Sequence, residues 1–225
     1  MESQNKVTIA IISVALGLLV GGGVGWAVAD MNKNNSNDMS MSMSSASTSS
    51  KASDLRANMV SFGVEHMDLT YAAIASTLNG TKSAEADGAA LYKNGTDIGA
   101  AVGSVYGKDA ETTFNTVWKL HLDEFVNYAV ASSKGDEDGK MKALESIDTN
   151  YTKPLAAYLA KANPNLPEDV LYKGLKGHVD MTAVMIDDEA KGDYTAAQTL
   201  RDEGADHLRD LFSTLAGGIA KQKNL

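Results

Sequence analysis

The chain has 225 residues, a formal net charge of −9 and no cysteine. The missing thiols exclude disulfides, thiolate catalysis, iron–sulfur clusters and cysteine-ligated zinc. The acidic balance, without any basic stripe, argues against nucleic acid and against anionic lipid surfaces as partners. Alanine is abundant, proline occurs three times and β-branched alternation is rare, so we expect an all-α fold.

Residues 7–29 carry no charged side chain. A helix of about twenty apolar residues crosses a bilayer core of roughly 30 Å, so this run is long enough for a membrane anchor. Ala27-Val28-Ala29 also has the small-x-small form of a signal-peptidase site. Two interpretations are open. Residues 1–29 are either a retained single-pass anchor in the cell membrane or the cleaved signal peptide of a secreted protein. Both place the rest of the chain outside the cytoplasm.

Residues 30–53 are rich in serine, asparagine and methionine, and this composition predicts a disordered linker. Met39, Met41 and Met43 alternate with serine. Thioethers are soft ligands that suit Cu(I), although a spacer of biased composition explains the same pattern without a metal.

Residues 54–225 show the three- and four-residue apolar spacing of amphipathic helices. Ser53 is expected to cap the first helix, Asp109 the third, and Pro167 should lie in the first turn of the fifth. The second helix could break near Asn94-Gly95, and Pro154 should kink or interrupt the fourth, because proline lacks an N–H donor. The six expected helices end near Leu78, Tyr106, Ser133, Lys161, Ala190 and Lys221.

A His-x-Asp phrase occurs three times in these helices, at His66, His121 and His178. A period of about 56 residues is typical of duplicated supersecondary units. The pattern therefore predicts three repeated helical hairpins, at about 54–107, 108–163 and 164–221, packed together as a bundle.

The three histidines lie on apolar helix faces, where an unpaired polar group costs a few kcal/mol. Either each imidazole is a core hydrogen-bonding residue, or the three converge on a metal such as zinc, copper or iron. His207 or Glu124 could then complete the ligand set. The aspartate of each phrase lies about 200° around the helix from its histidine. It is therefore either a surface charge or a partner for a histidine on a neighbouring helix.

Motifs for catalysis are absent from the sequence. It contains no glycine-rich phosphate loop, nucleophile elbow or His-Glu-x-x-His. The paired Glu-x-x-His pattern of di-iron bundles is also missing. The sequence therefore favours a binding or interaction domain over an enzyme.

Six short motifs within residues 54–220 carry a family resemblance. They are Gly63-Val64-Glu65-His66, Ser104-Val105-Tyr106-Gly107, Trp118-Lys119-Leu120-His121, Phe125-Val126-Asn127-Tyr128, Asn165-Leu166-Pro167, and His178 with Gly192-Asp193-Tyr194. The chain resembles exported bacterial helical proteins often labelled copper amine oxidase-like. The resemblance implies a helical fold, an exported location and a connection with copper. It does not imply oxidase activity, because true copper amine oxidases are large β-rich enzymes. Their quinone comes from a tyrosine in an Asn-Tyr-Asp/Glu setting, whereas alanine and threonine follow the two Asn-Tyr pairs here.

These observations predict a membrane-tethered, extracytoplasmic helical domain that binds a transition metal, copper before zinc, through its inward histidines. The alternative is a non-catalytic structural or interaction module whose histidines are core hydrogen-bonding residues.

Overall fold

The computed structural model describes residues 50–225, which are all-α, as predicted, and contain no strand. They belong to one compact unit, Ser47–Leu225. The predicted anchor or signal segment and residues 30–49 of the predicted linker lie outside the described residues. None of the described helices combines the length and the apolar character needed to cross a membrane.

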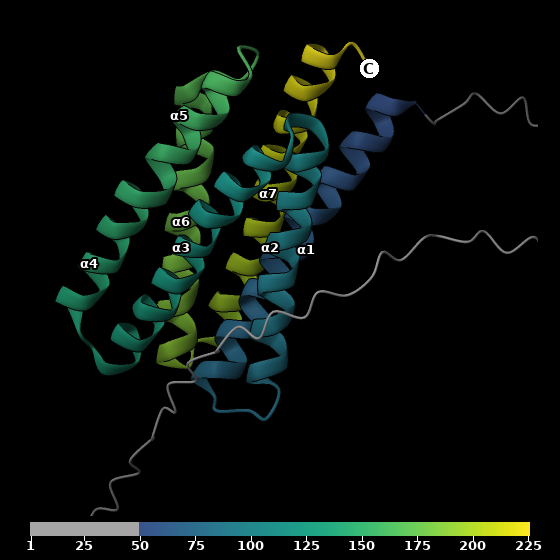
Figure 1. The fold of residues 1–225 in the computed structure, drawn as a ribbon. Coiled ribbons are helices and arrows are strands. Elements are labelled where there is room, and N and C mark those ends of the chain that lie inside the picture. The colour runs from purple at the N-terminus through teal and green to yellow at the C-terminus, as the bar shows by residue number, and fades with distance from the viewer. Residues whose placement is uncertain (1–49) are drawn as a thin grey trace, which may run out of the picture. The chain divides into compact units, whose positions relative to one another are not determined.

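The described chain consists of helical segments in close succession. They are α1 (Lys51–Leu78), α2 (Ala84–Tyr106), α3 (Lys108–Lys134), α4 (Glu137–Ile147), the π-helix η1 (Asp148–Thr152), α5 (Lys153–Ala162), α6 (Glu168–Lys191) and α7 (Tyr194–Lys223). Because α4, η1 and α5 continue into one another, residues 50–225 form six rods (Figure 1).

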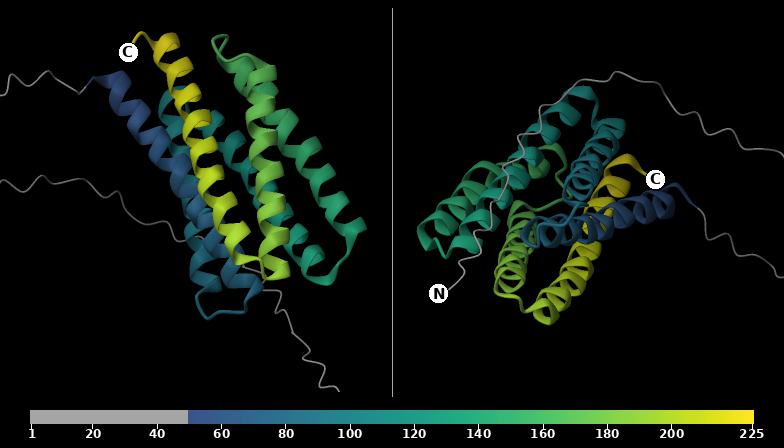
Figure 2. Two further views of the ribbon diagram at one scale, coloured as in Figure 1. Left: turned by 180° about the vertical axis from the view of Figure 1, so that it is seen from behind. Right: turned by 90° about the horizontal axis from the view of Figure 1, so that it is seen from below.

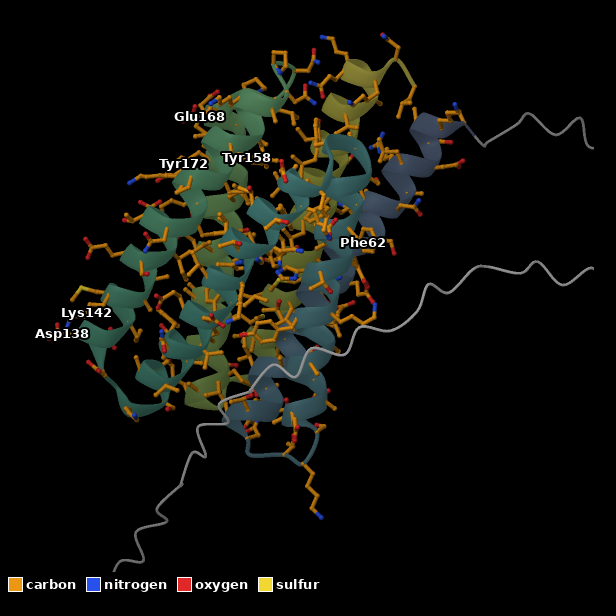
Figure 3. The ribbon with its side chains drawn as sticks, in the orientation of Figure 1. Phe62, Asp138, Lys142, Tyr158, Glu168 and Tyr172 are labelled. Carbon is orange, nitrogen blue, oxygen red and sulfur yellow. The ribbon has the colours of Figure 1, made fainter. Side chains whose placement is uncertain are left out.

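The rods run up and down side by side. The α1–α2, α3–α4 and α6–α7 turns lie at one end, and the α2–α3 and α5–α6 turns lie at the other (Figures 1 and 2). The α1–α2, α3–α4 and α6–α7 turns contain Gly80, Gly135 and Gly192 at positive φ, where a residue with a Cβ is strained. The α3 rod packs against α2, α4 and α6, and α1 packs against α2 and α7. Side chains fill the space between the rods, while Asp138 and Lys142 extend outward from α4 (Figure 3).

Three predicted helix starts are corrected by the cap geometry. Ser50, not Ser53, caps α1. The Ser50 hydroxyl accepts from the Ser53 N–H and the Ser53 hydroxyl accepts from the Ser50 N–H, which makes a capping box. The helix therefore begins inside the predicted linker. Gly107 rather than Asp109 precedes α3, and Pro167 is the residue before α6 rather than part of its first turn.

Pro154 interrupts the fourth rod, as predicted, and the structure shows how. Without an N–H, Pro154 cannot donate to the carbonyl four residues earlier, and its ring crowds that carbonyl. The helix therefore widens to a π-helical turn at Asp148–Thr152, and the Lys153 N–H donates to the Asp148 carbonyl. Tyr151, on this wide turn, is 1% exposed and packs into the bundle.

Glycines allow several rods to approach closely. The α2 rod does not break at Asn94-Gly95, and a Cβ at Gly95 would lie 2.7 Å from the Trp118 indole. A Cβ at Gly63 would lie 2.7 Å from the Phe212 ring and 3.1 Å from the Leu208 carbonyl oxygen. The α1–α7 contact therefore depends on the missing side chain at position 63.

A pair of glycine substitutions tests this contact. Gly63→Ala should lower the free energy of unfolding by about 1–3 kcal/mol, because α1 must move away from α7. Gly88→Ala, on α2 with no atom near its Cβ position, should raise it by about 0.5–1 kcal/mol. Urea unfolding followed by circular dichroism measures both. Equal effects of the two substitutions would contradict the packing argument.

Candidate metal centre

Three of the sequence-predicted site residues meet at the centre of the bundle. His66 projects from α1, His121 from α3 and His178 from α6. One ring nitrogen from each lies within 4.8 Å of the others, and the side chains are 1%, 0% and 2% exposed. The ring centroids of His66 and His121 are 5.8 Å apart, and those of His66 and His178 are 5.5 Å apart.

These separations suit a shared ion. With metal–nitrogen bonds near 2.0–2.1 Å, the centroids of two imidazoles on one ion lie roughly 5 Å apart. The two measured centroid distances exceed this by less than 1 Å. Small side-chain rotations would therefore bring the rings to bonding distance, without a change in the bundle.

The Asn94 side chain determines which nitrogen of His66 carries the proton. Its amide nitrogen donates to the Phe62 carbonyl and the Glu65 carboxylate, so its oxygen faces His66. That oxygen lies 3.2 Å from His66 Nδ1 and can only accept. His66 is therefore protonated on Nδ1. Its Nε2 lone pair is free, and this atom has no hydrogen-bond partner.

The other two imidazoles are even less satisfied. His178 Nδ1 lies 3.5 Å from the Thr182 hydroxyl, a long contact, and its Nε2 has no partner. Both nitrogens of His121 lack a partner. A contact with the Trp118 backbone acts to raise the pKa of His121, against the effect of burial. Leaving a buried polar atom unpaired costs about 1–3 kcal/mol, so these unpartnered nitrogens destabilise the folded state.

The electrostatic environment keeps the cluster neutral. Burial lowers the pKa of His66 to about 4, although its bond to Asn94 acts in the opposite direction. Burial lowers the pKa of His121 and of His178 well below the ordinary value, and repulsion from the neighbouring histidines adds to the effect. All three imidazoles are therefore neutral at pH 7, which is the form that binds metals.

Aromatic rings surround the cluster. The Trp118 indole meets the rings of His66 and His121 edge-on at 4.9 and 4.7 Å. Tyr151 stacks on His121 at 4.1 Å with 22° between the planes, so the widened turn at η1 supplies one wall of the site. These rings shield the three imidazoles from water.

An apolar cavity of about 40 Å³ adjoins the cluster. His178, Trp118 and Tyr151 form one side of it, and it extends toward the last residues of α2 and α5. The remaining lining residues are Met59, Ile98, Val102, Tyr106, Phe114, Leu155, Leu159, Ala162, Leu166, Leu175, Leu208, Leu211, Phe212, Leu215 and Ile219.

Two predicted ligands do not join the cluster. His207 Nε2 donates to the Gly174 carbonyl at 2.7 Å and ties α7 to α6. Glu124 accepts from the Ser146 hydroxyl and the Asn127 amide, and so links α3 to α4. The prediction that His207 or Glu124 completes the ligand set is therefore corrected, because helix-to-helix hydrogen bonds occupy both side chains.

The aspartates of the three phrases are surface charges, one of the two predicted roles. Asp68 pairs with Arg201, Asp123 with Lys119 and Asp180 with Lys176.

Asn94, rather than an aspartate, is the hydrogen-bond partner of a cluster histidine, His66. The sequence interpretation missed this role, because it treated Asn94-Gly95 only as a possible helix break. Asn94 lies at helical spacing between the apolar residues Leu91 and Ile98. An amide on this apolar face was the signal in the sequence that Asn94 is buried and needs a partner.

No protein-family model, curated protein or solved structure matches the chain. The likeness to copper amine oxidase-like proteins therefore stays a prediction from short motifs. The geometry of the histidine cluster is the basis for assigning a function.

The depressed histidine pKa values predict a loss of stability in acid. In the unfolded chain a histidine has a pKa near 6.5, so below that pH the unfolded state binds protons that the folded state does not. The free energy of unfolding should fall as pH drops from 7 toward 4. His66 alone accounts for about 3 kcal/mol of this fall.

Urea unfolding of the metal-free protein at about pH 7.5 and about pH 5 measures the effect. His66→Gln should reduce the difference between the two conditions. An unchanged free energy of unfolding at the lower pH would contradict burial of neutral imidazoles.

Proposed function

We propose that the bundle is a transition-metal-binding domain in which His66, His121 and His178 hold one copper ion. One observation carries the proposal: three neutral imidazoles are buried together, each with an unpartnered ring nitrogen. As core packing residues they would leave several polar atoms unsatisfied, whereas one ion would satisfy a nitrogen of each.

The surroundings favour copper over zinc. The cluster contains no carboxylate, and its neighbours are aromatic or apolar. Burying a singly charged Cu(I) among neutral ligands costs less desolvation free energy than burying a divalent ion. Zinc sites commonly add a fourth protein ligand or a water, and residues 50–225 offer the cluster neither a fourth side chain nor a polar space for water.

A structural or interaction module is the second candidate. Two contacts favour it, the His66–Asn94 hydrogen bond and the His121–Tyr151 stack, because both hold helices together without a metal. This alternative expects substitutions at the histidines to change stability alone.

The proposal includes location and origin. Residues 7–29 would tether the domain outside the cytoplasm, and the methionines of the linker would add soft ligands near it.

The three hairpins α1–α2, α3–α4 and α6–α7 would derive from one duplicated unit. In support, each contributes its histidine from the first helix and turns at a glycine of positive φ.

Copper titration tests the central claim. The full-length chain in detergent should bind one equivalent of Cu(I) under reducing conditions, and its melting temperature should rise because the ion binds only the folded state. His121→Gln should abolish the binding. His207→Gln is the matched control, since it removes the histidine outside the cluster, and it should bind as the wild type does. Equal melting temperatures with and without Cu(I) or Zn(II) would exclude the metal site.

Asn94 gives a second test, through orientation of His66. Asn94→Leu removes the acceptor that holds Nδ1–H, and Cu(I) affinity should fall by about 10–100-fold. Asn94→Asp keeps an acceptor oxygen for Nδ1–H but loses the N–H groups that donate to Phe62 and Glu65, so it should restore only part of the affinity. Competition with a coloured Cu(I) chelator measures both variants. Wild-type affinity in a folded Asn94→Leu variant would remove Asn94 from the site.

A further inference from the structure

We infer that the apolar cavity beside the histidine cluster binds a small apolar gas molecule, of the size of dioxygen, next to the metal. The cavity itself requires no metal, whereas the position next to copper rests on the proposed function.

The cavity and the cluster share their walls. His178 belongs to both, and its Nε2 has no hydrogen-bond partner. Trp118 and Tyr151 line the cavity and also contact the ring of His121. A molecule in the cavity therefore lies against the residues that would surround the ion.

Size and polarity select the ligand class. A water molecule needs roughly 10–15 Å³ of such space and two to four polar partners. The cavity measures about 40 Å³, which is room for a particle of a few atoms, but its lining is almost entirely aliphatic and aromatic. Cavities of this chemistry stay dry and accept apolar guests such as xenon.

The end of the cavity far from His178 has a polar cap. The Tyr106 ring lines the cavity, and its hydroxyl donates to Gln222 and accepts from Asn163. The Gln222 amide nitrogen donates to the Ala162 carbonyl. Tyr106 and Leu215 are lining residues that are only partly buried, so the cavity wall is not sealed from solvent there.

Xenon tests the cavity without metal. Methyl NMR of the full-length chain in detergent under xenon pressure should show shifts for Leu155, Leu175 and Leu211, which line the cavity. The exposed methyl groups of Val126 and Val184 serve as internal controls and should not move. Equal shifts at lining and exposed methyls would overturn the inference, and copper binding would be unaffected by that result.

Carbon monoxide then tests proximity to the ion. The Cu(I)-loaded protein should bind carbon monoxide, with an infrared C–O stretch characteristic of a copper carbonyl. Leu211→Phe fills part of the cavity from α7, where Leu211 packs against Gly174 one turn before His178, and should cause loss of this band, with copper stoichiometry unchanged. Leu200→Phe is the matched control, a partly buried leucine of α7 that does not line the cavity, and should keep the band.

The two experiments separate the two claims. An undiminished carbonyl band in Leu211→Phe would overturn the link between cavity and metal, even with xenon bound. Xenon shifts in a chain that takes up no copper would leave a gas-binding cavity, and would overturn both its position beside a metal and the proposed function.

Discussion

The bundle is organised around the desolvation of three imidazoles. Each would be better solvated in water, and each is held instead at the centre, where its charged form is excluded. That arrangement requires α1, α3 and α6 to meet at one level, and α3 contacts both of the other two. It also requires aromatic rings that pack against the imidazoles, and Trp118 and Tyr151 supply them at His121. The glycines at 63 and 95 then let the backbones approach closely enough to close the core.

Apolar periodicity was enough to predict the rods and the inward direction of the three histidines, because a helix face is a local property of the chain. The repeated phrase also contained the three histidines that meet in the core. Pro154 predicted an interruption, but the form it takes depends on how residues 148–152 pack, and Tyr151 gains its place beside His121 only through that packing.

The errors share a physical cause. Glu124 and His207 looked like ligands because a sequence shows residue types and not their partners, and hydrogen bonds to Ser146 and Gly174 occupy them in the fold. Asn94 was overlooked for the same reason, since its role depends on Phe62 and Glu65 on another helix. Ser53 was predicted as the helix cap in place of Ser50 because both are serines, three residues apart. Only the extended backbone conformation of Ser50 identifies it as the cap.

The depth of the cluster has a kinetic consequence. Its side chains are at most 2% exposed, and α1, α3 and α6, which carry them, pack against one another. Any ion larger than the gaps between side chains can then enter or leave only when a rod moves, so exchange follows the opening rate of the bundle rather than the strength of the bonds. The residence time of an ion at such a centre would therefore not follow from its binding affinity. A weakly held ion would still be retained for as long as the helices stay together.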